Sequence, residues 1–333
     1  MASPVRAASL DQHPAGNALP GQLLQLTAAQ HSALTGQQIR DAVGERRLRR
    51  AIRNGEIVKL WHGAYAVPRT PGRGALGSGA TPRLPVAEPI PVLTRLTAAE
   101  LTLGRSVTAC LDTAAELHGF STHRDPDTHV LGDARSTLGA LKVHRMPPIR
   151  PLQQRGFAAV DPAETAVRLA AAAANPPRAL AVLDAALRSA SSSREMLAAV
   201  ADESHLTRIG LVRTLVPLAD PRAESPPESW LRWVCHDAGF PPPEPQFWVQ
   251  CANERWFRLD LAWPRIKLAL EYDGVEFHTG RALTNDRARH NALAAQGWTV
   301  LSVTAPMVWS SREALVLQIG HELRRRGLFS GRT

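Results

Sequence analysis

The chain has 333 residues, of which 44% are hydrophobic and 21% charged, and its formal net charge is +9. This length exceeds what one hydrophobic core usually organises, so two or three folded domains are expected, and the composition excludes a largely disordered protein. No stretch approaches the roughly 18 apolar residues of a membrane span, and the N-terminus lacks the pattern of a secretory signal, so we expect a cytoplasmic protein with no membrane partner.

The positive charge is almost entirely arginine and is concentrated near the N-terminus. Residues 1–73 carry ten positive and four negative charges, whereas residues 224–333 carry thirteen and twelve. Arginine matches phosphate with two hydrogen-bond donors, although an arginine bias can also follow from codon usage. The local excess predicts a nucleic-acid contact, with a solvated surface as the alternative.

Cysteine and histidine spacing excludes the common metal motifs. The three cysteines are Cys110, Cys235 and Cys251. They show no C-x-x-C spacing, so structural zinc and a disulfide framework are not expected. His118, His129 and His144 are too loosely spaced in the sequence to predict a metal set.

The segment 21–68 predicts a winged helix-turn-helix. Two short helices joined by a tight turn are expected first, with Thr35 as the N-cap of the second. Residues 45–53 predict an amphipathic, arginine-rich helix, and residues 57–68 predict two short strands in a hairpin. An arginine-rich helix followed by a hairpin is typical of the winged helix-turn-helix, which binds double-stranded DNA.

In that arrangement the arginine-rich helix would lie in the major groove and the hairpin would contact the backbone. The predicted DNA-binding residues are Arg46, Arg47, Arg49, Arg50, Arg53 and Lys59. The alternative is an amphipathic helix whose arginines face water.

The other segments before residue 220 carry no recognisable chemistry. Residues 1–20 predict a disordered lead, and the Pro- and Gly-rich residues 69–91 predict a linker. Residues 92–220 predict a mostly helical middle domain with strands at 128–131 and 141–144. Helices are expected over 93–103, 108–118, 162–174, 178–189 and 195–216.

The segment 222–330 predicts an α/β domain. A helix begins near Pro226 and carries Glu228, where a glutamate ordinarily offsets the helix dipole. Two strands follow with Asp260 and Glu271, and alternation puts Lys267, Glu271 and Asp273 on one face. The full order of helix, three strands, helix, strand predicts a mixed sheet with helices on it.

Strands usually exclude carboxylates, so Asp260, Glu271 and Asp273 need a compensating cation if they are buried. Oxygen ligands from carboxylates suit Mg²⁺ or Mn²⁺. The sequence therefore predicts a metal site.

These elements resemble the PD-(D/E)XK restriction-endonuclease-like superfamily and, more closely, the very-short-patch-repair-like nucleases grouped as domain of unknown function 559. The resemblance covers about residues 222–328. It rests on Glu228, Asp260, Glu271-x-Asp273-Gly274, His278, Asp286, Arg289 and Gly297-Trp298. Residues 20–68 resemble the winged-helix N-terminal domain of the AbiEi-type antitoxin family.

The first resemblance implies Mg²⁺- or Mn²⁺-dependent hydrolysis of DNA phosphodiester bonds. Asp260 and Glu271 would hold the metal, Glu228 would act through its outer shell, and the metal would activate water. Asp273 departs from the pattern, because the superfamily usually has a lysine there. Lys267 would lie about 13 Å from Glu271 along an extended strand, so it is a poor substitute for that lysine.

Two further residues are candidates by position. His278 could act as a general base or phosphate ligand. Arg289 could contact DNA, or it could form a surface ion pair with Asp286, which has little energetic weight. The candidate catalytic set is Glu228, Asp260, Glu271, Asp273 and His278.

Three functions remain open. The first is a DNA-binding protein with a Mg²⁺-dependent endodeoxyribonuclease domain. The second is a catalytically silent DNA-binding regulator of the toxin-antitoxin or defence-related kind, with the third domain as a scaffold or a homodimer surface. The third is an interaction protein without nucleic acid. The clustered carboxylates favour the first, and the missing lysine opposes it.

Overall fold

The computed structural model describes residues 21–68, 89–123, 125–145, 151–274 and 281–329. Within these ranges, twelve α-helices and three sheets are distributed over two compact units. The first unit comprises Met1–Val107 and Ser136–Lys142, and the second comprises the rest of the chain. The predicted lead (1–20) and most of the predicted linker (69–91) lie outside the described residues.

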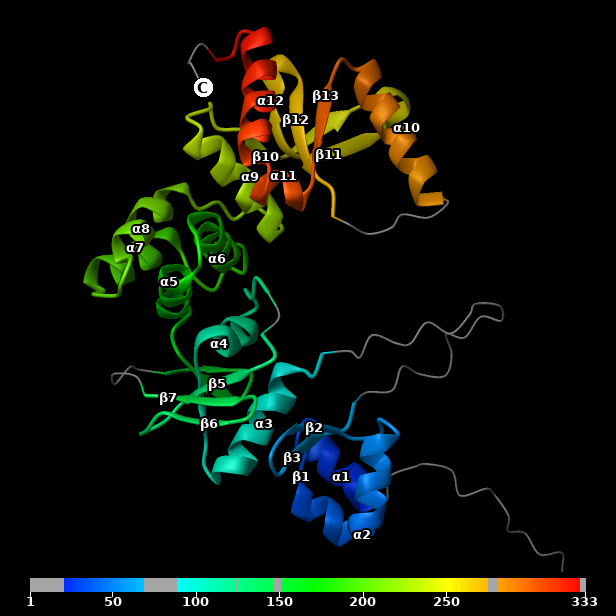
Figure 1. Cartoon of the computed structure of the whole chain (residues 1–333), viewed down its shortest axis with the longest axis vertical. Helices are drawn as coiled ribbons and strands as arrows, with labels where there is room; N and C mark the ends of the chain where they lie inside the picture. Colours follow the sequence, from blue (N-terminus) through cyan, green and yellow to red (C-terminus); the bar gives the residue numbers. More distant parts are fainter. Residues whose placement is uncertain (1–20, 69–88, 124, 146–150, 275–280, 330–333) are drawn as a thin grey trace, which may run out of the picture. The chain divides into compact units, whose positions relative to one another are not determined.

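The first unit contains the predicted hairpin and helices, with the second short helix and the arginine-rich helix joined in α2 (Figure 1). Its elements are α1 (Gly21–Ala29), β1 (Ala33–Thr35), α2 (Gly36–Arg53), β2 (Val58–Trp61), β3 (Ala64–Ala66) and α3 (Val92–Leu103). The strands form an antiparallel sheet in the order β1-β3-β2. Buried Leu23, Leu34, Ile39 and Leu48 form its core.

Helix α2 begins and bends for local reasons. Thr35 Oγ1 accepts a hydrogen bond from the backbone N–H of Gln38 at 3.1 Å, and Gln38 Oε1 accepts one from the Thr35 N–H at 2.8 Å. This reciprocal capping box confirms Thr35 as the N-cap. Gly44 interrupts the helix at φ 74°, a conformation that glycine adopts without strain. Two helical segments therefore stand on either side of Gly44.

Helix α3 follows the predicted linker but belongs to the first unit. Thr94 Oγ1 donates to the backbone oxygen of His31 at 2.6 Å. Trp61 Nε1 at the end of β2 donates to Thr102 Oγ1 at 2.8 Å. These bonds fix α3 to the turn before β1 and to the hairpin.

The middle of the chain contains a six-stranded sheet, of which the prediction of a mostly helical domain included two strands. Its strands are β4 (Thr108–Ala109), β5 (Thr128–Leu131), β6 (Ser136–Leu138), β7 (Leu141–His144), β8 (Leu152–Gln154) and β9 (Phe157–Ala159). The structure confirms the predicted strands β5 and β7. The others were missed because two or three residues are too few to show a period-two pattern. The predicted helix over 108–118 is shorter, since β4 precedes α4 (Leu111–His118).

Four helices follow this sheet where three were predicted, because the predicted helix over 195–216 is divided between Glu203 and Ile209 and not at Gly210. They are α5 (Pro162–Ala172), α6 (Pro176–Arg188), α7 (Arg194–Glu203) and α8 (Ile209–Leu215), followed by a 3₁₀ turn at Val216–Leu218. Their core consists largely of alanine, valine and leucine. Asp161 and Asn175 cap α5 and α6 through their side chains, which is the usual start signal of a helix.

The C-terminal part has the predicted order of helix, three strands, helix and strand (Figure 1). Its elements are α9 (Pro226–Asp237), β10 (Glu244–Gln250), β11 (Trp256–Trp263), β12 (Leu268–Tyr272), α10 (Arg281–Ala295), β13 (Thr299–Val303), α11 (Ala305–Trp309) and α12 (Arg312–Arg325). The sheet has the order β10-β11-β12-β13, antiparallel except that β12 and β13 are parallel.

Two hydrophobic clusters cover this sheet. Leu261 and Leu270 pack with Leu231 of α9, whereas Ala262 and Ala269 pack with Leu293 of α10. The alternation of side chains along β11 and β12 therefore directs Asp260 and Glu271 toward α10.

One strand prediction was wrong. Lys267 does not share a strand face with Glu271, because it precedes β12 in a left-handed conformation at φ 49°. Its Nζ donates to the backbone oxygen of Gln296 at 2.8 Å. A tight turn between β11 and β12 takes Lys267 out of the alternation.

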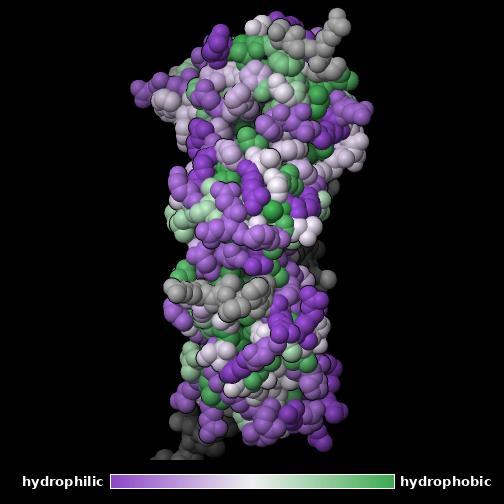
Figure 2. Space-filling view, turned by 90° about the vertical axis from the view of Figure 1, so that its left-hand side faces the viewer, coloured by the Kyte–Doolittle hydropathy of each residue, from purple (hydrophilic) through white to green (hydrophobic). Residues whose placement is uncertain are grey.

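Hydrophilic residues dominate the face drawn in Figure 2, with hydrophobic residues scattered between them. Across the described ranges, every helix is too short or too polar to cross a bilayer.

Candidate functional site

The two central carboxylates meet on neighbouring strands of the C-terminal sheet. Strand β11 pairs with β12 in a register that joins Leu261 to Leu270. One step further along this register Asp260 faces Glu271, and opposed residues project to the same side of a sheet. The backbone N–H of Tyr272 donates to Asp260 Oδ2 at 3.0 Å. Opposed like charges are unfavourable, so this pair requires protonation or a cation.

Arg289 of α10 supplies positive charge to Glu271. Its Nη2 contacts Glu271 Oε1 and donates to the backbone oxygen of Arg258 at 2.6 Å. Arg258 forms an ion pair with Glu224 through two bonds of 2.8 and 2.6 Å. The guanidinium of Arg289, predicted as a DNA contact or a partner of Asp286, thus lies on Glu271. The side chain of Asp286 lies outside the described residues.

Burial sets the protonation of both central carboxylates. It raises the pKa of Glu271 to about 7, although Arg289 opposes this shift and Asp260 adds to it. Burial also raises the pKa of Asp260, which the Tyr272 N–H lowers and the nearby Glu228 raises. Near neutral pH the cluster therefore tends to hold a proton unless more positive charge is present.

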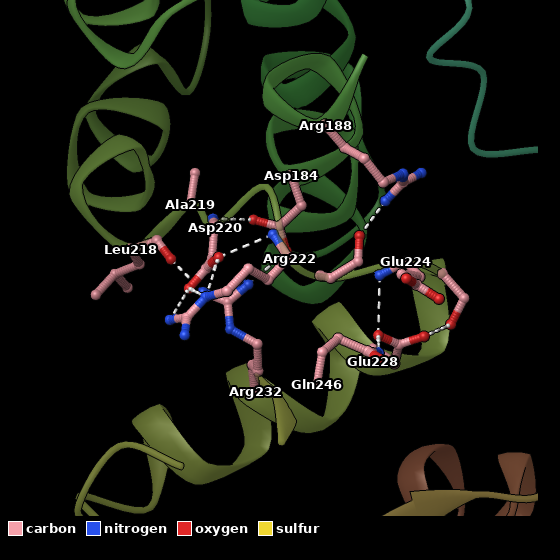
Figure 3. A network of polar contacts seen from close by, with 12 residues as sticks. Asp184, Arg188, Leu218, Ala219, Asp220, Arg222, Glu224, Glu228, Arg232 and Gln246 are labelled. Atoms are coloured by element: carbon pink, nitrogen blue, oxygen red, sulfur yellow. Dashed lines mark hydrogen bonds and ion pairs between the residues drawn. The ribbon is translucent and has the colours of Figure 1, made fainter. Parts of the chain in front are cut away.

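Glu228 lies in the first turn of α9 and is 6% exposed. Its Oε1 accepts a hydrogen bond from Ser225 Oγ at 2.7 Å, and its Oε2 accepts from the Glu224 N–H at 2.9 Å. Oε2 also accepts from Gln246 Nε2 of β10 at 2.7 Å (Figure 3). Glu228 therefore closes the start of its helix and connects it to the sheet that carries Asp260.

Gln246 belongs to this cluster although sequence reasoning passed over it. Because Phe247 pairs with Leu259, Gln246 lies opposite Asp260. Its φ of 56° is unusual for a residue other than glycine, and such strain is concentrated at functional sites. Its buried Oε1 has no hydrogen-bond donor within the described part of the chain. A glutamine within a strand gives no sequence signal for this strain.

The remaining predicted catalytic residues lie at the edge of the cluster or beyond it. Asp273 follows β12, is exposed, and donates its backbone N–H to the oxygen of Val303 at 2.8 Å. Its charge still contributes to the raised pKa of Glu271. His278 lies outside the described residues. The structure thus groups Glu228, Asp260 and Glu271 and leaves Asp273 peripheral.

The predicted DNA-binding arginines of α2 fall into two groups. Arg47 pairs with Glu56 at 3.0 Å and Arg49 with Glu45 at 2.9 Å. The exposed side chains of Arg46, Arg50 and Arg53 form no ion pair with another described residue. They are spaced i, i+4 and i+7, so they share one face of the helix. Lys59 is exposed on β2.

Ligand atoms for a metal converge elsewhere in the second unit. Within the described ranges, two trios of side chains have ligand atoms within 4.8 Å of one another. They are Asp112, His123 and Asp125, and Asp125, Asp127 and His129. The predicted metal pair Asp260 and Glu271 belongs to neither trio.

A buried ion pair joins α6 to α9. Asp184 is fully buried, and Arg232 Nη1 contacts its Oδ2 at 2.6 Å (Figure 3). The backbone N–H of Asp220 donates to Asp184 Oδ1 at 2.7 Å. Burial nevertheless raises the pKa of Asp184 to about 6, with Arg232 opposing the shift. This pair connects the helical bundle to the C-terminal domain.

Comparison with known proteins places the chain in a family. A family model described as the AbiEi antitoxin C-terminal domain matches residues 107–218. Two proteins of Mycobacterium tuberculosis, the uncharacterized proteins MT2308 of strain CDC 1551 and Rv2248 of strain H37Rv, are each 36% identical over 279 residues. The match spans 82% of this chain and 95% of each relative. The chain belongs to the family of these mycobacterial proteins.

The antitoxin match lies on an unexpected segment. An AbiEi-type resemblance is confirmed for the chain, but the matching model is that of the antitoxin C-terminal domain on residues 107–218. The sequence had suggested it for residues 20–68. The matched segment comprises the sheet β4–β9 and helices α4–α8, the region to which sequence motifs assigned no chemistry.

Proposed function

We propose that this protein is a DNA-binding regulator of the toxin-antitoxin or defence-related kind, which contacts double-stranded DNA through its first unit. The match to the AbiEi antitoxin C-terminal domain supports the class, and the arginine face of α2 carries the DNA-binding part. Its partner in this proposal is an operator on chromosomal or plasmid DNA, so the protein would act in the cytoplasm. A homodimer, as many operator-binding proteins form, is part of this proposal.

The arrangement of α2 and the hairpin supports groove binding. Gly44 separates a first helical segment from a second one that ends at Arg53, and the β2–β3 hairpin follows it. This is the order of a winged helix-turn-helix, in which the second segment enters the major groove. Lys59 on the hairpin would contact a phosphate beside the groove.

The arginines of α2 differ in whether an acidic side chain already engages them, and this sets how readily each can bind DNA. Arg46, Arg50 and Arg53 point from one exposed face and are available to phosphates or bases. Arg47 is about a quarter exposed and is engaged with Glu56, so it holds the helix against the turn that leads to the hairpin. Arg49 would have to exchange Glu45 for a phosphate. We therefore expect the first three to dominate DNA affinity.

The test is a triple variant, Arg46→Ala with Arg50→Ala and Arg53→Ala, measured by fluorescence anisotropy on DNA from the protein's own promoter region. Binding should weaken, and the slope of log K against log salt should become shallower by up to about 3, since each lost phosphate contact removes about 0.9. The control removes the same charge from exposed arginines of the second unit, Arg145, Arg265 and Arg325. Equal binding of the triple variant at all salt concentrations would exclude the first unit as the DNA-binding module.

We propose phosphodiester hydrolysis as a second candidate function, because one observation favours it. Asp260 and Glu271 are opposed carboxylates with raised pKa values, and the buried Gln246 Oε1 nearby lacks a hydrogen-bond donor within the described ranges. An all-oxygen set of this kind fits Mg²⁺ or Mn²⁺. Asp260 and Glu271 would hold the ion, and Glu228 would hold Gln246 in place.

When bound, such an ion supplies an activated water for attack on a phosphodiester. Arg289 would keep Glu271 oriented and offset negative charge beside it. Asp273 cannot do the work of a lysine, since a carboxylate does not stabilise developing negative charge. His278, beyond the strand, remains the proposed general base.

Cleavage and ion binding are measured together. Supercoiled plasmid is incubated with the protein and Mg²⁺ or Mn²⁺, and Mn²⁺ binding is followed by electron paramagnetic resonance. Both should be lost in Asp260→Asn and Glu271→Gln and retained in Glu254→Gln, which changes an exposed glutamate. Intact plasmid and absent Mn²⁺ binding in the unmodified protein would leave the regulator alone.

A further inference from the structure

A mixed cluster of aspartate and histidine side chains lies between α4 and β5. Asp112 occupies the first turn of α4, and His123 Nε2 lies 3.5 Å from its Oδ1. Asp125 brings a third ligand atom within 4.8 Å of these two. An aspartate at a helix start offsets the dipole, but this role does not explain the convergence of His123 and Asp125.

Asp125 is oriented by partners that leave ligand capacity on its carboxylate. Its Oδ1 accepts the backbone N–H of Asp127 at 2.9 Å, and its Oδ2 lies 2.9 Å from His129 Nε2. His129 Nδ1 in turn lies 2.8 Å from His144 Nε2 of β7. A carboxylate has about four lone-pair sites, so these contacts leave positions for a cation. The chain from His144 through His129 fixes the direction of Asp125.

The cluster borders a cavity of about 550 Å³. Asp112 and His123 line it, together with Arg178 of α6 and Trp230 of α9. The buried Trp230 Nε1–H has no acceptor among the described residues. Trp230 lines the cavity as a residue, whereas its Nε1 atom is itself buried. The cavity beside Asp112 and His123 leaves room for a further ligand next to the converging side chains.

We propose that Asp112, His123 and Asp125 bind one divalent transition-metal ion, of the Zn²⁺ or Mn²⁺ class, in the wall of this cavity. One imidazole with two carboxylates suits such ions better than Mg²⁺, which takes oxygen ligands. Three protein ligands leave coordination positions open toward the cavity. His129 is a positioning residue that acts through Asp125, a part that neighbouring hydrogen-bond partners commonly play at metal sites.

The second trio, Asp125, Asp127 and His129, is the weaker candidate. His129 Nε2 already contacts Asp125, and its Nδ1 contacts His144, so coordination through Nε2 would break the bond that orients Asp125. The two trios share Asp125 but make different predictions for His123 and His129.

The full-length protein, stripped of metal with a chelator, is titrated with Zn²⁺ by calorimetry and with Co²⁺ by visible absorption. One equivalent should bind, and excess Mg²⁺ should not displace it. His123→Ala, an exposed position, and Asp125→Asn should abolish binding at that site. His129→Gln should weaken it by about 10-fold to 100-fold. The control His321→Ala changes an exposed histidine of α12 and should bind as the unmodified protein does.

Three results would overturn the proposal: no Zn²⁺ binding by the folded protein, unchanged binding in His123→Ala, or a complete loss in His129→Gln with binding retained in His123→Ala. Melting temperatures of each variant identify misfolding, and the exposed His123 provides a variant that should fold. Glu271→Gln should leave Zn²⁺ binding intact. This separates the site from the candidate nuclease centre.

Discussion

Two clusters of carboxylates in the second unit are compensated in different ways. Asp260 and Glu271 lie opposite each other on paired strands, and a fixed guanidinium from α10 contacts Glu271. Asp112 lies at a helix start and Asp125 in a loop, and their partners are the imidazole rings of His123 and His129. A guanidinium keeps its charge at all accessible pH values, whereas an imidazole can lose its proton or exchange it for a metal ion.

Glu271 and Asp125, one carboxylate from each cluster, differ in the direction of their pKa shifts. Burial and crowding of like charges raise the pKa of Glu271 to about 7 in spite of Arg289. For Asp125 burial also acts upward, but the Asp127 N–H and His129 outweigh it, so the pKa is lowered. A strand pair constrains its carboxylates to face each other, and a loop can turn its backbone N–H toward the charge. Asp125 and Glu271 should therefore respond to pH in opposite directions, whereas burial raises the pKa of Asp112 beside His123, as it does that of Glu271.

The largest expected effect concerns the ion pair between Arg232 and the fully buried Asp184. Arg232→Ala should lower the free energy of unfolding by about 3–5 kcal/mol at pH 8, because it leaves Asp184 buried without a partner. Since the pKa of Asp184 is raised to about 6, protonation should reduce this loss at pH 5. Urea denaturation at both pH values measures it. The control Arg222→Ala removes an exposed partner of Asp220 and should cost under about 1 kcal/mol; equal losses in both variants would contradict the role of burial.

The next effect is the pH dependence that Glu271 causes. Its pKa in the folded protein is above the ordinary value, so its contribution to stability is full below about pH 4.5 and is lost as pH rises through about 7. Glu271→Gln should flatten this decline by on the order of 3 kcal/mol, at 1.36 kcal/mol per pKa unit. Chemical denaturation between pH 4.5 and 8 tests it, with the exposed Glu313→Gln as control. An unchanged pH profile in Glu271→Gln would show that Arg289 neutralises the burial.

Asp125 should produce the opposite slope at smaller size. Its lowered pKa means that it stabilises the fold above its ordinary pKa of 3.8 and loses this contribution as pH falls through its folded value. Asp125→Asn in metal-free protein should therefore destabilise the fold at pH 7 and have no effect at the acid end. The same denaturation series measures the difference, with exposed Asp202→Asn as control. A loss that persists unchanged at low pH would point to packing and not to charge.

The smallest effect is expected where a fixed cation is exposed. Arg49 and Glu45 lie 2.9 Å apart with side chains 70% and 51% exposed. Arg49→Ala should lower the free energy of unfolding by only a few tenths of a kcal/mol. Calorimetry in low and high salt checks this. A loss above about 1 kcal/mol would mean that Arg49 packs against the unit as well.

Local patterns in the sequence predicted much of the fold. Thr35, three residues before Gln38, marked the start of α2, and the alternating apolar residues from 57 to 68 marked the hairpin. The order of helices and strands after residue 222 followed from periodicity and from the prolines near Glu228. The short strands of the middle sheet were not predicted, because each contributes too few residues for a period and depends on pairing with distant segments.

In the candidate sites, too, some features follow from local sequence and others from contacts between distant segments. The sequence by itself determined that Asp260 and Glu271 lie on adjacent strands and that arginines gather on one helix, since both follow from neighbours within a few residues. Only the tertiary structure decided that Arg289 contacts Glu271, that Gln246 lies strained opposite Asp260, and that His129 meets His144. These pairs are 15 or more residues apart or depend on sheet register. Loop closure and packing bring them together, and no local spacing in the sequence encodes either.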